Sequence, residues 1–172
     1  TRAVAQLVLL DSTFDALPPV VAEGRRVLGN IERTSGLYLN KTVYAMLISL
    51  AIGVAGFVFP FLPRHLTIVS SLTIGIPGFF LALAPNTRRY EPGFVGRVAR
   101  FAIPAGLVAA TATFTAYAIA RAADTSVDEA RTAATITLLA VGLAVLALLA
   151  RPLTPVRMAL LAGMAALFVA AM

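Results

Sequence analysis

Five long apolar runs dominate the sequence and restrict what the chain can fold into. They cover about residues 37–60, 65–84, 101–120, 132–150 and 156–172. A helix needs about 20 apolar residues to cross a bilayer, and each run is close to that length. Only 13% of the residues are charged, about half of the ~25% usual in soluble domains, and the mean hydropathy is +0.89. We therefore predict an all-α membrane protein, a polytopic helical bundle of about five transmembrane helices.

The basic residues lie between the apolar runs and do not form one soluble face. The net charge of +6 therefore does not indicate nucleic-acid binding, and we expect no nucleic-acid partner. Short loops rich in arginine stay in the cytoplasm. This rule places residues 1–36, 85–100 and 151–157 in the cytoplasm of a multi-pass membrane protein, whose main partner is the lipid bilayer.

The first 36 residues differ from the rest. Leu7–Leu10 has the pattern of a short buried strand, and residues 18–36 have apolar side chains on one side of a predicted helix and charged ones on the other. A segment this short cannot form a core of its own. We expect residues 1–17 to be the tail of a soluble domain and residues 18–36 to be a cytoplasmic helix entering the membrane. The chain begins Thr-Arg-Ala and ends in an apolar run, so we expect a fragment.

The sequence contains no evident catalytic residues. It has no cysteine, so it has no thiolate metal site, and one histidine, His65, cannot hold zinc alone. None of the five apolar runs contains a carboxylate, although Ca²⁺ normally prefers carboxylates among its oxygen ligands. No Ser/His/Asp set or phosphate-binding glycine loop is present. No metal site is certain, and any bound cation needs hydroxyl, amide and carbonyl oxygens.

The stretch Ser70–Gly78 offers such oxygens within the second run. Pro77 has no N–H for the carbonyl of Thr73, so we predict that this carbonyl is released. Ser70, Thr73 and Pro77 share one helix face, which gives two hydroxyls and a free carbonyl. Broken helices of this kind form ion sites in transporters. The alternative is a plain proline kink whose hydroxyls bond back to their own helix.

A second group of candidates is Asn40, Lys41 and Thr42 in the first run. If the membrane begins near Val43, Lys41 extends to the cytoplasmic interface. If it begins near Gly36, Lys41 is an ionisable group inside the membrane, which usually marks a functional site. As a helix, residues 37–60 would measure about 36 Å, more than a ~30 Å hydrocarbon core, so hydropathy leaves both interpretations open.

The last three runs are rich in small residues. Ala102, Gly106 and Ala110 are four residues apart, and so are Ala159 and Gly163. This spacing lets membrane helices approach closely. None of the three runs contains an intramembrane charge, so we predict that they serve as structural scaffold.

The order of several short motifs resembles one family. They are Val8-Leu-Leu-Asp-Ser-Thr-Phe14, Val21-Ala-Glu-Gly-Arg-Arg-Val27, Asn30-Ile31, Ile74-Gly-Ile-Pro77 and Ala84-Pro-Asn86. Together they resemble the junction in P-type cation-transporting ATPases where the phosphorylation domain ends and a stalk helix enters the fifth membrane span. The resemblance is specific over residues 4 to 86 and is strongest to the actinobacterial CtpE-type calcium pumps.

This resemblance implies spans five to nine of an ATP-driven cation pump. Mg-ATP would be hydrolysed in upstream domains outside this chain, and the N-terminal half of the same pump would be its partner. The resemblance places cation-binding positions at or beside Lys41, Thr42 and Ala45, and at Ser70, Thr73 and Ile74. Ala45 and Ile74 stand where calcium pumps usually have acids.

The implied cargo is Ca²⁺, with Mg²⁺ or another cation left open. Lys41 is then a candidate built-in counter-charge that occupies the pocket by Thr73 after the cation has left. The alternative function is a small non-enzymatic permease subunit or a scaffold for partner helices.

Overall fold

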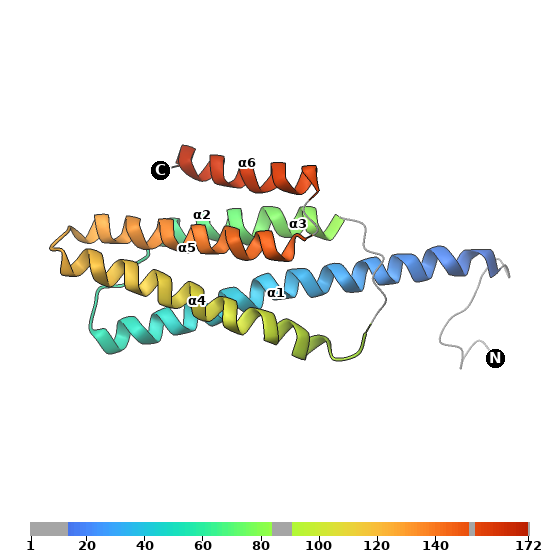
Figure 1. Ribbon diagram of the computed structural model, residues 1–172, viewed down its shortest axis with the longest axis horizontal. Coiled ribbons are helices and arrows are strands. Elements are labelled where there is room, and N and C mark those ends of the chain that lie inside the picture. Colours follow the sequence, from blue (N-terminus) through green and yellow to red (C-terminus); the bar gives the residue numbers. More distant parts are fainter. Residues whose placement is uncertain (1–13, 84–90, 152–153, 172) are drawn as a thin grey trace.

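The computed structural model describes residues 14–83, 91–151 and 154–171, and within these ranges the chain is helical, with no strand (Figure 1). The strand predicted at Leu7–Leu10 lies outside the described residues. The elements in order are a 3₁₀ turn η1 (Phe14–Ala16), α1 (Leu17–Ala55), α2 (Pro63–Ser70), a π-helical turn η2 (Ser71–Gly75), α3 (Ile76–Leu83), α4 (Phe94–Ala122), α5 (Val127–Leu149) and α6 (Pro155–Ala171). The prediction of an all-α bundle is confirmed.

The helix α1 is the longest element and joins the predicted stalk to the first apolar run without a break. Its 39 residues include Pro18 and Pro19 in the first turn, where a missing N–H breaks no hydrogen bond. The N-terminal half extends beyond the other helices (Figure 1). The predicted end at residue 60 is wrong. Gly56 adopts a left-handed conformation, with φ of 66°, and its N–H bonds to the carbonyl of Ile52, which ends the helix.

Four stretches are long and apolar enough to cross a membrane, by length and composition. These stretches are Phe14–Ala55, Pro63–Leu83, Phe94–Ala122 and Val127–Leu149. The fifth predicted span, α6, is an apolar helix of only 17 residues. The turn before α5 is closed by a capping box, in which the Ser126 hydroxyl accepts from the Glu129 N–H and the Glu129 carboxylate accepts from the Ser126 N–H. The chain is a multi-pass membrane protein.

The most extensive contact between two helices joins α1 and α4, which cross (Figure 1). Ala102, Gly106 and Ala110 are all buried on α4. A Cβ atom at Gly106 would lie 2.6 Å from the Cβ and Cγ1 atoms of Val43 and 3.2 Å from the carbonyl oxygen of Asn40. Real Cβ atoms do not come this close to other atoms. The close approach predicted for Ala102, Gly106 and Ala110 is therefore confirmed, and it requires a glycine at position 106.

The second small-residue pair does not behave in this way. Ala159 on α6 is exposed, and a Cβ atom at Gly163 would meet nothing within 4 Å. The prediction of a close approach at this pair is wrong for the described residues. The helix α6 instead packs through larger side chains, Met164 and Phe168, which are both 6% exposed. Small-residue spacing permits close packing, but a neighbouring helix must also lie on that face.

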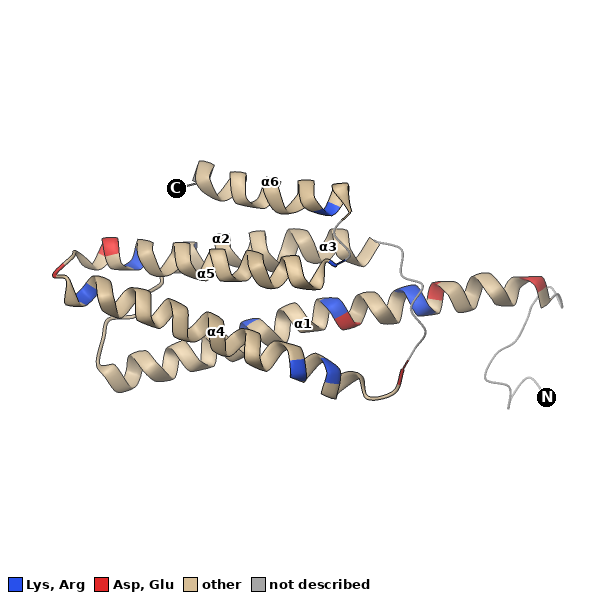
Figure 2. Ribbon diagram, viewed as in Figure 1, with Lys and Arg blue, Asp and Glu red and all other residues tan. Residues whose placement is uncertain are grey.

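Charged residues gather at the two ends of the bundle (Figure 2). We call one end the basic end, because arginines of the first half of α1 and of the starts of α4 and α6 lie there. There Arg97 on α4 pairs with Glu32 on α1. At the other end the loop between α1 and α2 is fixed to the α4–α5 hairpin, since the Tyr117 hydroxyl donates to the Val58 carbonyl at 2.8 Å. The described parts of the arginine-rich segments predicted to share one side of the membrane, in the first half of α1 and at the starts of α4 and α6, therefore lie at the same end.

Candidate functional site

The predicted break in the second span is a π-turn. Residues Ser71–Gly75 form η2, and the N–H of Ile76 bonds to the carbonyl of Ser71, five residues earlier. This wider turn ends two residues before Pro77, whose missing N–H disturbs the hydrogen bonding of the helix. Single π-turns inside α-helices occur often at functional sites. Release of the Thr73 carbonyl stays a prediction.

The three candidate residues of this span lie toward the protein interior. Pro77 is fully buried, Thr73 is 4% exposed and Ser70 is half-buried. The Thr73 hydroxyl donates to the Val69 carbonyl of its own helix at 2.7 Å. The hydroxyl proton is thus used locally, as in the plain alternative, while the oxygen keeps lone pairs that can accept a hydrogen bond or meet a cation.

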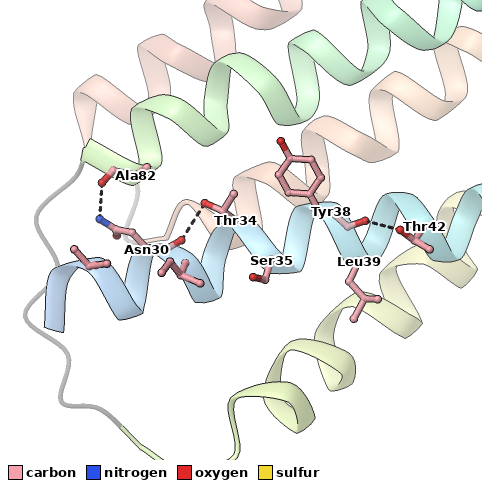
Figure 3. A pocket seen from close by; sticks show the side chains of 9 residues that line it. Asn30, Thr34, Ser35, Tyr38, Leu39, Thr42 and Ala82 are labelled. Carbon is pink, nitrogen blue, oxygen red and sulfur yellow. Dashed lines mark hydrogen bonds between the residues drawn. The ribbon is translucent and has the colours of Figure 1, made fainter. Parts of the chain in front are cut away.

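Two contacts fix how α1 runs beside α3. The Asn30 side-chain amide donates to the Ala82 carbonyl at 2.8 Å (Figure 3). A Cβ atom at Gly78 would lie 4.0 Å from the Thr34 methyl group. The helices are antiparallel, because a step of four residues along α1 matches a step of four back along α3. Continuing this register by about two more turns places Lys41 at the level of Ser71, the first residue of the π-turn.

The three consecutive candidates on α1 point in different directions, because residues of an α-helix are spaced by about 100°. Asn40 is buried, at 5% exposure, beside the crossing with α4. Lys41 is about three turns beyond Asn30 and therefore on the side that faces α3 and η2. Lys41 is half-buried, and no hydrogen bond or ion pair of its ammonium group is found among the described residues. Thr42 is exposed, and its hydroxyl bonds back to the Tyr38 carbonyl at 3.1 Å.

Two buried polar atoms have no protein partner among the described residues on α1 and α4. They are Oδ1 of Asn40 and Oγ1 of Thr113, which is 0% exposed. Buried polar atoms almost always have a partner, so each of these oxygens is an available acceptor. Asn40 was identified from the sequence. Thr113 was not, because nothing in its sequence context separates it from threonines such as Thr111, whose hydroxyl bonds back to its own helix.

Ile74 and Ala45 stand where calcium pumps usually have acids, and their surroundings differ. Ile74 is 5% exposed and packs in an apolar cluster with Leu37 and Leu81. Its side chain helps to hold the π-turn against α1. Ala45 is exposed on α1. Among the described residues no group of three or more His, Cys, Asp or Glu side chains could hold a metal ion.

An open groove runs along one side of α1 (Figure 3). Its volume is about 680 Å³, and it is lined by Val27, Asn30, Ile31, Thr34, Ser35, Tyr38, Leu39, Thr42 and Ala82. The groove starts in the predicted stalk and reaches the candidate residue Thr42. It combines apolar side chains with hydroxyl groups, as helix-packing surfaces in membranes do.

Asn30 is a structural residue that the sequence showed only as part of a motif. It is 4% exposed and donates to a carbonyl in the last turn of α3, where helix carbonyls lack partners within the helix. We expect Asn30→Ala to destabilise the full-length protein by about 1–3 kcal/mol, because the Ala82 carbonyl loses its donor. Asn30→Asp should cost more, because a carboxylate would face that carbonyl. Thermal unfolding in detergent checks the order.

Thr67→Ala is a matched control for this prediction. Thr67 is exposed, and its hydroxyl bonds only within its own helix, to the Pro63 carbonyl. Its removal should leave the unfolding temperature near that of the wild type. An Asn30→Ala protein as stable as the Thr67→Ala protein would show that the bond between α1 and α3 contributes nothing.

The sequence did not reveal the ion pair at the basic end. Arg97 Nε and Nη2 lie 2.9 and 3.1 Å from the two carboxylate oxygens of Glu32, and Arg97 also donates to the carbonyls of Pro92 and Glu91. One side chain thus ties the segment before α4 to the predicted stalk. A pair separated by this much sequence leaves no local pattern.

The fold therefore defines a class: a multi-pass helical membrane protein with one span broken by a π-turn and a neighbouring span that carries a half-buried lysine. Comparison with known proteins identifies the particular relatives. The chain is 52% identical over 88% of its length to the calcium-transporting ATPase CtpE of Mycolicibacterium smegmatis and 49% identical over 93% to that of Mycobacterium bovis. It is 34% identical over 63% of its length to the probable cation-transporting ATPase exp7 of Streptococcus pneumoniae.

The chain is thus a homologue of part of these cation-transporting ATPases, and the resemblance seen in the sequence is confirmed. It spans only 21% and 22% of the length of the two CtpE relatives. No protein-family model matches the chain, and no solved structure matches it significantly.

Proposed function

We propose that this chain is the stalk and part of the membrane domain of a P-type cation pump of the plasma membrane. The observation that carries this proposal is the 49–52% identity to calcium-transporting ATPases over most of the chain. The pump hydrolyses Mg-ATP in domains outside this chain. Residues 18–36 link those domains to the membrane, and the basic end faces the cytoplasm, as expected from its arginine-rich loops.

We further propose that cations bind between α1 and the π-turn. The candidates are Asn40, Lys41, Thr42, Ser70, Thr73 and Pro77. Two observations support this location: the burial of Thr73 in a widened turn, and the buried Asn40 oxygen without a partner. The helix register, extrapolated from Asn30 and Thr34, also places Lys41 at the level of Ser71. In the proposed cycle the Lys41 ammonium occupies the pocket near Thr73 after the cation has left. A positive charge inside the membrane needs oxygen partners, and the π-turn offers hydroxyl and carbonyl oxygens at that level.

The proposed cargo is Ca²⁺, with Mg²⁺ or another cation as the alternative. The predicted spans contain no carboxylate, so the residues of this chain supply hydroxyl, amide and carbonyl oxygens alone. Ca²⁺ usually takes six to eight oxygen ligands. The remaining ligands, and the compensating negative charge, must then come from helices of the pump outside this chain.

The groove along α1 is the proposed contact with those other helices. It is open, it spans both the stalk and the membrane part of α1, and it ends beside Thr42. A helix from the rest of the pump that lies there would cover the hydroxyls of Ser35 and Thr42 and approach the candidate cation site from the side opposite α4. The chain accounts for about a fifth of the length of its CtpE relatives, so such helices are expected.

Cation-dependent ATP hydrolysis by the full-length protein tests the function and the site together. We expect hydrolysis to be stimulated by Ca²⁺ in a panel that includes Mg²⁺, Mn²⁺ and Zn²⁺. Thr73→Ala and Lys41→Ala should each change the cation concentration for half-maximal activity, because one removes an oxygen and the other a charge at the site. The exposed Ala159→Val on α6 serves as the control and should leave this concentration unchanged.

Unchanged cation dependence in both the Thr73 and the Lys41 variants would refute the site. Absence of stimulation by every cation in the panel would refute the function. The alternative of a permease subunit or a helix scaffold has no supporting observation here, because the homologues are ATPases.

A further inference from the structure

The helix α5 touches the π-turn at a glycine. A Cβ atom at Gly142 would lie 2.8 Å from Cγ2 of Thr73, 3.3 Å from its Cβ and 3.6 Å from its Oγ1. The first distance is one that real Cβ atoms do not adopt. Any residue other than glycine at position 142 must therefore displace Thr73 or move α5 away from η2.

Thr73 cannot simply rotate to make room. Its hydroxyl is held by the 2.7 Å bond to the Val69 carbonyl, and its side chain is 4% exposed. Rotation about χ1 would break that bond and move the methyl group elsewhere within a packed interior. The position of the Thr73 oxygen is thus set from two sides, by its own helix and by the bare backbone of Gly142.

Glycine is used in this way at two places among the described residues. A Cβ atom would approach another atom to less than 3 Å only at Gly106 and Gly142. Other glycines of the apolar helices, such as Gly53 and Gly163, would meet nothing within 4 Å. Gly106 lies on α4 against Asn40 and Val43, and Gly142 lies on α5 against Thr73. One helical hairpin therefore contacts both segments that carry the candidate cation ligands, each time through a glycine.

We propose that Gly142 is a positioning residue for cation binding, which holds the Thr73 oxygen at its place in the π-turn. This inference rests on the cation site proposed above. It adds a residue of α5 that does not touch the cation and that acts through Thr73. A methyl group at position 142 pushes Thr73, together with the π-turn that carries it, away from α5 and so weakens cation binding.

The test is a set of variants of the full-length protein: Gly142→Ala, Thr73→Ser and both together. Gly142→Ala should raise the Ca²⁺ concentration for half-maximal ATPase activity at least about fivefold. This corresponds to about 1 kcal/mol, the lower end of the free energy that an overpacked contact usually costs. Thr73→Ser keeps Oγ1 and removes the Cγ2 that clashes, so alone it should have a small effect. In the double variant it should return the half-maximal concentration close to that of the wild type.

The control for general packing is Gly163→Ala. A Cβ atom there meets nothing within 4 Å, so this change should leave both the half-maximal concentration and the thermal unfolding temperature unchanged. The inference is overturned if Gly142→Ala lowers the unfolding temperature but keeps the wild-type half-maximal concentration, or if Thr73→Ser does not rescue it. The proposed function fails instead if the wild type itself shows no cation-stimulated hydrolysis.

Discussion

Gly106→Val should prevent the membrane bundle from assembling. Even the first carbon of the new side chain would lie 2.6 Å from two atoms of Val43 and 3.2 Å from the Asn40 carbonyl. One neighbour is backbone, and another is the Cβ of a β-branched residue, so neither can swing aside. Overpacking alone commonly costs about 1–3 kcal/mol, and here the most extensive helix contact of the bundle has to separate. We expect most of the full-length protein to aggregate.

Size-exclusion chromatography of the full-length protein in detergent measures this effect. Gly163→Val is the matched control, because it places the same side chain on an apolar helix where a Cβ atom meets nothing within 4 Å. It should elute and unfold as the wild type does. A Gly106→Val protein that also eluted and unfolded normally would mean that α1 and α4 do not cross as described.

Arg97→Ala should produce the second large effect. It removes a two-pronged ion pair with Glu32 and two hydrogen bonds to the carbonyls of Glu91 and Pro92. Both charged side chains are about one third exposed, so solvent weakens the pair, and we expect a loss of about 1–3 kcal/mol. Arg97→Lys should rescue little of it, since an ammonium group cannot make the two-pronged contact.

A double-mutant cycle of Arg97→Ala and Glu32→Ala, read by thermal unfolding of the full-length protein, isolates the energy of this pair. Arg26→Ala is the control. Arg26 pairs with Glu23 three residues earlier on the exposed side of α1, and such pairs are worth about 0.2–0.5 kcal/mol. Equal effects of the Arg97 and Arg26 variants would show that the start of α4 is not fixed to α1.

The sequence predicted the helices well because hydropathy reports directly on burial in a bilayer. Five apolar runs correspond to the helical stretches observed, and the main error, the end of the first run, arose at Gly56. Apolar residues continue through Phe57 to Phe59, so hydropathy does not register the left-handed glycine that ends α1. The sequence also predicts the stalk and the first run as two segments, because their polarity differs, whereas in the structure they form one unbroken helix, α1.

The candidate site was less predictable, because its geometry depends on partners far apart in the sequence. Pro77 indicated a disturbed helix but not that the disturbance is a π-turn, which arises from how the whole span packs. The small-residue pattern was correct at Gly106 and wrong at Gly163, although both look alike locally. Gly142 could not be singled out from the sequence, because a single glycine in an apolar run forms no pattern. Its contact with Thr73 is visible only in the folded structure.

The continuity of α1 has a mechanical consequence. At about 1.5 Å per residue its 39 residues measure about 58 Å. The bond of Asn30 to α3, the pair of Glu32 with Arg97 and the crossing at Gly106 hold α1 at three places along this length, so it cannot pivot freely about one of them. A pull along the helix axis at the N-terminal end would instead move Lys41 by nearly the same distance, because an unbroken hydrogen-bonded helix hardly stretches. A displacement of the predicted stalk would therefore reach Lys41 directly.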